Sequence, residues 1–324
     1  MELKRIAVFS APNDPVEQRH RDVIQAAAPN TQIIFANSYD ELYKQTNDVD
    51  AMVMWPFIDD SIIHFCQNAP SLKWIHCFIS GVDALVNSPL NDLPITITST
   101  KGIHGPNISD HALAYIFSFL RQFPNALRAQ LERRWESRKL CAACQESCDQ
   151  TIGVVGVGAI GIEIARKCKL LGMRVIGAKR TPIKSEWLDE CYSMSELDKL
   201  LEQSDFVILI LPLTKETKNL MSTPQFAKMK NTAYLINLAR GAIVDDEALL
   251  KALDAGELAG AGLDIFTKEP LDENSPFWLH PKILITHHTA PGTPHYMDRA
   301  AQVVAENIRR YLADEPLLYV AERD

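Results

Sequence analysis

The chain has 324 residues, of which 47% are hydrophobic, and it carries a net charge of −8. A chain of this length can bury a large core and favours two domains over one. Its negative charge gives no electrostatic basis for binding nucleic acid or an anionic membrane surface. No apolar run approaches the roughly 20 residues that span a bilayer, and the N-terminus turns polar too soon for a secretory signal. We therefore expect a cytoplasmic protein with reduced cysteines.

Three of the seven cysteines, Cys141, Cys144 and Cys148, are close enough in sequence to share a metal ion. A tetrahedral site needs a fourth ligand, however, and no second cysteine pair has zinc spacing. We expect no metal here and interpret these side chains as buried or idle thiols.

The first hundred residues alternate strand and helix patterns. Strands are predicted at 5–10, 32–35, 51–55, 73–78 and 95–98, and a helix at 15–27. This alternation is typical of a small parallel-sheet domain. After the fourth strand comes Ile79-Ser80-Gly81-Val82-Asp83, where the glycine either offers bare backbone N–H groups to an anion or makes a plain turn.

The composition changes at 101–107, Lys-Gly-Ile-His-Gly-Pro-Asn, which is typical of a hinge. An apolar helix is predicted directly after it, at 111–121. We interpret the hinge as a domain boundary.

A glycine turn opens the second domain. The apolar run 151–155 leads into Gly156-Val157-Gly158-Ala159-Ile160-Gly161 and then into a helical pattern. Glycines at the start of a helix bring backbone N–H groups against a diphosphate without Cβ atoms in the way. Alone the pattern is weak, because such a turn can be purely structural. Placed between a strand and a helix, it predicts that a dinucleotide binds at Gly156, Gly158, Ala159 and Ile160.

The strand–helix alternation continues to the end of the chain. Further strands or helices are predicted at 174–178, 195–201, 205–211, 223–229, 233–237, 245–255 and 261–265. The helix predicted at 296–312 has one apolar face and should return to the first domain. The predicted fold is α/β with two doubly wound parallel-sheet domains. A Rossmann NAD(P)-binding domain, 104–288, is inserted into a smaller flavodoxin-like substrate domain, 1–103 plus 289–324.

The residues after the second strand of the Rossmann domain indicate which nucleotide binds. NAD-binding domains place an acidic residue there, about 20 residues after the glycines, to bind the ribose hydroxyls. Lys179 and Arg180 stand there instead. They suit a 2′-phosphate, although both could simply point into solvent. The sequence favours NADP(H), with NAD(H) as the second option.

Reactive side chains follow three later strands: Arg240, Glu269 and His288. Such a set can bind a carboxylate, orient an imidazole and exchange a proton. Taken singly, Arg240 and Glu269 could be surface ion-pair partners and His288 a core or loop histidine. Together, behind a dinucleotide turn, they favour a catalytic site.

The sequence closely resembles the D-isomer-specific 2-hydroxyacid dehydrogenases. The resemblance is carried, in chain order, by the motifs GVVGVGAIG, LPLTKET, LINLARGAIVDDEAL, AGLDIF, EP and TxHxA. Within the family, the chain resembles the glyoxylate/hydroxypyruvate reductase branch in two features. These are the stretch SPFWLHPKI and the absence of an acidic residue after the second strand of the Rossmann domain. The resemblance implies a homodimeric enzyme that uses NAD(P)H to reduce a small 2-keto acid, such as glyoxylate or hydroxypyruvate, to the D-2-hydroxy acid.

The resemblance also implies roles for single residues. Arg240 would hold the substrate carboxylate, His288 would donate the proton, and Glu269 would hydrogen-bond His288 and favour its protonated form. Further substrate contacts would come from Trp55, Ser80, Gly81 and Val82. Further cofactor contacts would come from Leu211, Pro212, Thr217, Leu238, Ala239 and Asp264.

Two alternatives stay open at this point. His287 stands where the family usually has proline, so two adjacent imidazoles compete for the proton-donor role, and alignment on Thr289-Ala290 favours His288. The second alternative is a dinucleotide-sensing binding protein with little turnover, as in the co-repressors that share this fold. The sequence favours the enzyme, because Arg240, Glu269 and His288 supply all three polar side chains that the reaction needs.

Overall fold

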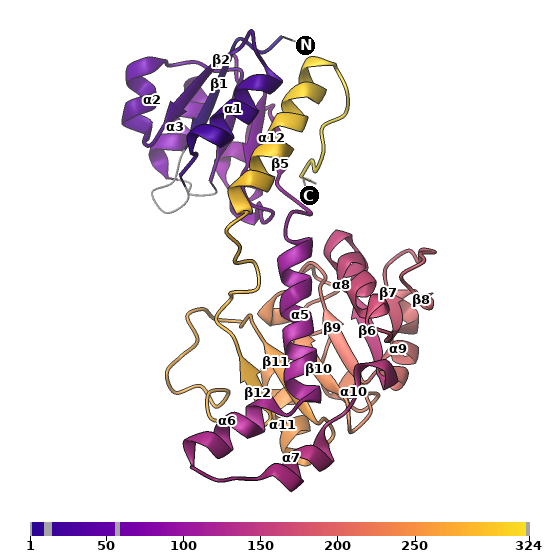
Figure 1. Ribbon diagram of the computed structural model, residues 1–324. Coiled ribbons are helices and arrows are strands. Elements are labelled where there is room, and N and C mark those ends of the chain that lie inside the picture. Colours follow the sequence, from indigo (N-terminus) through magenta and orange to yellow (C-terminus); the bar gives the residue numbers. More distant parts are fainter. Residues whose placement is uncertain (1, 10–14, 56–58, 322–324) are drawn as a thin grey trace. The chain divides into compact units, whose positions relative to one another are not determined.

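The computed structural model describes residues 2–9, 15–55 and 59–321 (Figure 1). Residue 10, the last of the first predicted strand, lies outside them. The chain forms two compact units. Unit 1 is Met1–Ile103 with Thr293–Asp324, and unit 2 is His104–Gly292. Each unit is built on one sheet in which all strand pairs are parallel, as predicted.

Unit 1 has five strands in the order β2-β1-β3-β4-β5. The strands are β1 Arg5–Phe9, β2 Gln32–Ala36, β3 Ala51–Met54, β4 Trp74–Cys77 and β5 Thr96–Ser99. The helices are α1 Gln18–Ala27, α2 Tyr39–Gln45, α3 Asp60–Asn68, α4 Asp83–Val86 and α12 Tyr296–Leu312. Alternate residues of β1 enter two cores: Ile6 and Val8 pack with α1 and α12, whereas Ala7 packs with α2 and α3.

The predicted return of the last helix to the first domain is confirmed. In unit 1, α12 lies beside α1 (Figure 1). His20 of α1 places Nε2 3.0 Å from Asp298 Oδ1 of α12. The apolar face of α12, including Ala300, Val304 and Ile308, is buried in the same core as β1.

Unit 2 has seven strands in the order β12-β11-β10-β9-β6-β7-β8. The strands are β6 Thr151–Val155, β7 Arg174–Ala178, β8 Glu190–Tyr192, β9 Phe206–Leu209, β10 Tyr234–Asn237, β11 Gly260–Leu263 and β12 Ile283–Ile285. The helices are α5 Gly105–Leu120, α6 Phe123–Leu131, α7 Ser137–Ala143, α8 Ala159–Leu170, α9 Leu197–Gln203, α10 Thr223–Phe226 and α11 Asp246–Ala255. The strand order reverses direction at β6, so the glycine turn after β6 lies at the switch point where α/β sheets bind ligands.

Two predicted helices differ in the structure, and the strand β8 is not predicted from the sequence. The first long helix of unit 2 begins at Gly105 rather than at 111, because Pro106 occupies its first turn, where proline needs no hydrogen-bond donor. The predicted helix 195–201 is a 3₁₀ turn, Met194–Glu196, followed by α9. The edge strand β8 has three residues, none of them buried, and shows no apolar pattern.

The chain returns to unit 1 between Gly292 and Thr293, whereas the sequence places the return after residue 288. The intervening segment is bonded to unit 2: Thr289 N and Ala290 N donate to the Asp264 carboxylate at 2.9 and 3.0 Å. Asn107 Nδ2 donates to Ala290 O at 3.0 Å.

Among the helices of the described ranges, none has the length and apolarity that crossing a bilayer requires.

His76 of β4 is a fully buried histidine in unit 1. Its Nε2 lies 2.9 Å from Thr100 Oγ1, and its Nδ1 lies 2.8 Å from Thr98 Oγ1. Thr100 donates to Cys77 O, so Nε2 carries the proton. The amide of Asn307 points a donor at Nδ1 from 3.4 Å, which disfavours a second ring proton. Burial lowers the pKa of His76 to about 3.

Stability should therefore fall at acid pH. Unfolded histidine titrates near pH 6.5, so below that pH the unfolded chain binds a proton that folded His76 does not. The contribution of His76 to the free energy of unfolding is constant above about pH 6.5 and is lost as pH falls toward 3. The loss amounts to about 2 kcal/mol between pH 7 and pH 5. Urea unfolding at both pH values should show a smaller pH-dependence in His76→Gln than in wild type. An unchanged pH-dependence would contradict this assignment.

Candidate active site

Three neighbouring strands bring the predicted catalytic residues to one edge of the unit 2 sheet. Strands β10, β11 and β12 are adjacent, and their last residues are in register, Asn237 with Leu263 and Leu263 with Ile285. The segments that follow them carry Arg240, Glu269 and His288 respectively. Because the strands are parallel, all three segments leave the sheet at its carboxyl edge, where ligands of this fold bind.

His288 and Glu269 form a hydrogen-bonded pair. His288 Nδ1 lies 2.7 Å from Glu269 Oε2. The other oxygen, Oε1, accepts from Phe266 N at 2.9 Å, so both oxygens of Glu269 are held. Because Nδ1 faces Glu269, Nε2 is the ring nitrogen left to exchange a proton with a substrate. The His288 side chain is 46% exposed, so a ligand can reach it.

The adjacent histidine is placed differently. The ring of His287 lies against Trp278, with centroids 5.8 Å apart. Of the two imidazoles that compete in the sequence, the structure brings His288 to the carboxylate.

Asp264 holds the segment that carries His288. Its side chain is fully buried, and its carboxylate accepts hydrogen bonds from Thr286 Oγ1, Thr289 N and Ala290 N. Its backbone oxygen accepts from His288 N at 2.8 Å. These bonds hold His288 at φ +54°, a left-handed conformation that non-glycine residues rarely adopt. The predicted contact of Asp264 with the cofactor stays a prediction.

Asn237 fixes the bend before Arg240. This buried amide accepts from Ala239 N and donates to Arg240 O, both at 3.0 Å. The Arg240 guanidinium donates to Ala239 O at 2.7 Å, and the residue is exposed. Leu238 and Ala239 are buried directly after β10. Sequence reasoning assigned no role to Asn237 or Thr286, although a polar residue at the end of an apolar strand is a usable signal.

The glycine turn has the geometry that a diphosphate requires. Gly156 has φ +106°, and a Cβ there would lie 2.5 Å from Ile210 O. A Cβ on Gly161 would lie 2.3 Å from Gly156 O, so this close approach also needs glycine. A Cβ on Gly158 would meet nothing within 4 Å, and no side chain caps α8 at that residue. The start of this helix therefore presents bare backbone N–H groups, which fit a dinucleotide diphosphate.

The other predicted cofactor residues follow β7 and β9. Leu211 and Pro212 lie in the loop after β9, and Thr217 donates to Pro212 O at 2.8 Å, so it closes this loop. Lys179 is half-buried and Arg180 exposed after β7. Glu216 lies in the loop after β9, between Pro212 and Thr217. A hydrogen bond from Thr214 is the main cause that lowers the pKa of Glu216, and the positive charge of Arg180 also lowers it. Arg180 therefore lies near this loop.

The predicted substrate residues Trp55, Ser80, Gly81 and Val82 belong to unit 1. The Trp55 ring is stacked on Tyr296, with centroids 5.8 Å apart, and packs on Phe78 at 5.6 Å. Ser80, Gly81 and Val82 are half-buried between β4 and α4. Their contact with substrate stays a prediction.

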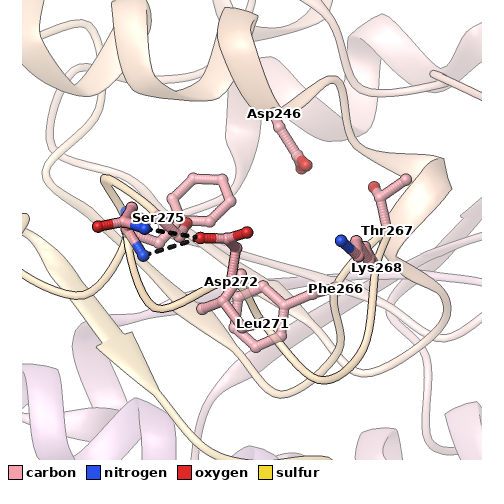
Figure 2. Close-up of a pocket in the computed structure, with 9 residues that line it drawn as sticks. Asp246, Phe266, Thr267, Lys268, Leu271, Asp272 and Ser275 are labelled. Carbon is pink, nitrogen blue, oxygen red and sulfur yellow. Dashed lines mark hydrogen bonds between the residues drawn. The ribbon is translucent and has the colours of Figure 1, made fainter.

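The segment after β11 also lines an open pocket of about 380 Å³ (Figure 2). Asp246 and Lys268 point their charged groups into it, and Phe266, Leu271 and Phe277 supply apolar walls. Arg240, Glu269 and His288 are not among its lining residues. The pKa of Asp246 is raised, chiefly by burial and also by the negative charge of Asp245. A hydrogen bond from Thr267 opposes this rise.

Cys141 and Cys148 are exposed and Cys144 is half-buried. In the part of the chain that the structure describes, no three His, Cys, Asp or Glu side chains are arranged to hold a metal ion.

Comparison with known proteins places the chain in a family. The family model described as D-isomer specific 2-hydroxyacid dehydrogenase, NAD binding domain, matches residues 113–290, more than half of the chain. The chain belongs to the D-isomer specific 2-hydroxyacid dehydrogenase family. The predicted resemblance is confirmed, and this dehydrogenase is an NAD(P)-dependent enzyme that acts on 2-keto and 2-hydroxy acids.

Individual relatives agree over nearly the whole length. A glyoxylate reductase from Korarchaeum cryptofilum is 33% identical over 273 residues, 82% of this chain and 81% of that protein. A D-isomer specific 2-hydroxyacid dehydrogenase from Xanthobacter autotrophicus, solved with NADPH and MES, is 30% identical with a TM-score of 0.81 and covers 98% of both chains. The NADPH-dependent glyoxylate/hydroxypyruvate reductase from Sinorhizobium meliloti, solved with NADP and sulfate, is 25% identical with a TM-score of 0.80 and covers 99% of both chains.

Gly241 allows the Arg240 and Glu269 segments of this dehydrogenase to approach each other. A Cβ on Gly241 would lie 2.0 Å from the carbonyl carbon of Phe266, so Gly241→Ala must displace that backbone. We expect Gly241→Ala to lower kcat/KM for keto-acid reduction by about 10-fold or more, because Glu269 moves with the displaced segment. The measurement is NADPH oxidation at 340 nm. Gly105→Ala, whose Cβ meets its nearest neighbour at an ordinary 3.6 Å, is the control. Equal activity in the two variants would contradict this interpretation.

Proposed function

We propose that this dehydrogenase is an NADPH-preferring reductase of a small 2-keto acid of the glyoxylate or hydroxypyruvate kind. The product is the corresponding 2-hydroxy acid of D configuration where a stereocentre forms. His288 donates the proton. The observation that supports this best is the 2.7 Å pair of His288 Nδ1 and Glu269 Oε2 at the carboxyl edge of the sheet.

The residues divide the chemistry between them. The nicotinamide, when bound, supplies the hydride that reduces the keto carbon. The backbone at Gly156, Gly158, Ala159 and Ile160 would hold the diphosphate at the start of α8. Arg240 binds the substrate carboxylate and polarises the keto oxygen, since a guanidinium can donate two parallel hydrogen bonds to a carboxylate.

Proton transfer uses the other two side chains. His288 delivers the proton from Nε2 to the keto oxygen, and in the reverse direction takes it back. Glu269 stabilises the imidazolium and keeps the ring oriented through Nδ1. The assignment of Trp55, Ser80, Gly81 and Val82 to substrate binding is part of this proposal, and so is that of Leu211, Pro212, Thr217, Leu238, Ala239 and Asp264 to cofactor binding.

The preference for NADP(H) rests on Lys179 and Arg180. The residues that follow β7 carry two cations and no carboxylate, so a 2′-phosphate would gain charge-assisted hydrogen bonds there. Two relatives support this proposal, because the Xanthobacter and Sinorhizobium enzymes were solved with NADPH and NADP.

The proton-donor assignment is tested by two single variants. His288→Ala should lower kcat for glyoxylate or hydroxypyruvate reduction by about 10²–10⁴-fold, since general acid catalysis contributes that much. His287→Ala should stay within about threefold of wild type, because that ring lies against Trp278. A nearly inactive His287→Ala with an active His288→Ala would reverse the assignment.

The cofactor preference is tested at Arg180. Arg180→Ala should raise KM for NADPH by about tenfold and leave KM for NADH nearly unchanged, because only the 2′-phosphate loses a charged partner. Lys184→Ala, an exposed lysine in the following loop, serves as the control for loss of a positive charge. Equal effects on both cofactors, or a wild-type preference for NADH, would show that the proposed preference is wrong.

We also propose that the enzyme is a homodimer that buries an apolar stripe of unit 2. Phe123, Leu127 and Leu131 are spaced four residues apart along α6, and Trp135 lies in the irregular segment that follows this helix. They are 55%, 57%, 84% and 94% exposed. Large exposed apolar side chains gathered on one helix and the segment after it are typical of an interface between proteins.

The dimer is tested by light scattering after gel filtration. Wild type should run at twice the 36.3 kDa mass of one chain. Leu131→Asp should shift the enzyme toward monomer, because an unpaired charge is costly in an apolar interface. Leu279→Asp, at a residue that is 93% exposed outside the stripe, should stay dimeric. A monomeric wild type would contradict the proposal.

A further inference from the structure

Beneath the His288 segment, one hydroxyl joins side chains from two parts of unit 2. Thr286 Oγ1 is hydrogen-bonded to Asp264 Oδ1. The same oxygen lies 3.0 Å from His111 Nε2 and 2.6 Å from Tyr115 Oη. His111 and Tyr115 are four residues apart on α5, so both reach Thr286 from one face of that helix.

The directions of these hydrogen bonds follow from what each group can donate. A hydroxyl has one proton and two lone pairs, and a carboxylate only accepts. Thr286 must therefore donate its proton to Asp264, and its lone pairs must accept from His111 and Tyr115. His111 accordingly carries a proton on Nε2. The hydroxyl is then saturated, and its proton can point only at Asp264.

Two of the three partners of this hydroxyl are buried and closely packed. Asp264 is fully buried and Tyr115 is 2% exposed. The Tyr115 ring packs on the bare backbone of Gly262 in β11, where a Cβ would lie 2.6 Å from the ring. The rings of His111 and Tyr115 contact each other edge to face, with centroids 5.1 Å apart. Thr286 and His111 are half-buried, whereas the Asp264 carboxylate is fully buried, so the hydrogen bond from Thr286 to Asp264 is the contact that is costly to break.

We propose that Thr286, with His111 and Tyr115 as its donors, is a positioning residue for the proton donor. The Thr286 hydroxyl fixes the Asp264 carboxylate, and Asp264 in turn holds the backbone N–H groups on the far side of His288, those of Thr289 and Ala290. This keeps His288 in its left-handed conformation with Nδ1 against Glu269. The inference rests on the proposed role of His288.

Loss of the Thr286 hydroxyl should affect proton transfer more than binding. The diphosphate turn follows β6 and Arg240 follows β10, so neither belongs to the segment that Asp264 holds. A poorly positioned His288 lowers kcat, whereas KM for the keto acid depends mainly on Arg240. This split between kcat and KM separates positioning from a general loss of structure.

The test compares Thr286→Val with Thr286→Ser. Valine keeps the shape of the side chain without the hydroxyl, and serine keeps the hydroxyl. Thr286→Val should lower kcat for glyoxylate reduction by about 10–100-fold with KM for glyoxylate within about twofold, and Thr286→Ser should restore kcat to within about threefold. Thr96→Val, at a threonine of unit 1 that is half-buried like Thr286, is the control for the replacement of threonine by valine. Tyr115→Phe, which keeps the ring on Gly262 and removes only its donor, should lower kcat by a smaller factor.

Several outcomes would overturn the proposal. A Thr286→Val enzyme within threefold of wild-type kcat would do so, and so would a Thr286→Ser enzyme as impaired as Thr286→Val. If Thr286→Val does not fold, Tyr115→Phe decides: wild-type kcat in that variant rejects the network. His288→Ala, measured in parallel, distinguishes failure of the proposed function from failure of the positioning role of Thr286. An active His288→Ala enzyme rejects the proposed function itself, whereas an inactive His288→Ala beside an active Thr286→Val rejects only the positioning role.

Discussion

The carboxylate of Asp264 is the group on which the arrangement of the candidate site depends. It accepts from the backbone of Thr289 and Ala290 and from the Thr286 hydroxyl, and so secures the residues on both sides of His288. A histidine in a left-handed conformation is strained, and such strain persists only where surrounding bonds hold it. The 2.7 Å pair with Glu269 therefore reflects the way the segment is held as much as the two side chains themselves.

Parallel strands explain why a few short segments suffice for a site. The ends of β10, β11 and β12 are in register, so residues separated by tens of positions in sequence leave the sheet at one edge. Bare glycine backbone matters at two points of this edge. At Gly156 it creates the diphosphate turn, and at Gly241 it lets the Arg240 segment approach the backbone before Glu269. Between them these features position the proposed cofactor site and the proposed catalytic residues of unit 2.

Much of this arrangement could be predicted from the sequence. Strand β7 and helix α12 have the predicted bounds, because an apolar run and a long amphipathic face are unambiguous periodic signals. The family followed from motifs in a fixed order. The start of α5 was missed, since Gly105-Pro106 also suits a hinge, and β8 was missed because an exposed edge strand of three residues has no apolar pattern. The role of Thr286 depends on His111 and Tyr115, which lie 175 and 171 residues away in sequence, and single-sequence patterns carry no information on such pairings.

The central claim is that Arg240 and His288 act on one bound keto acid. Its most direct test is a crystal structure of the enzyme with NADP and oxamate, an unreactive analogue of a 2-keto acid. The account predicts the Arg240 guanidinium on the oxamate carboxylate and His288 Nε2 within hydrogen-bond distance of the adjacent carbonyl oxygen, with Nδ1 still on Glu269. Oxamate bound away from both side chains, or contacted by His287 in place of His288, would contradict the account.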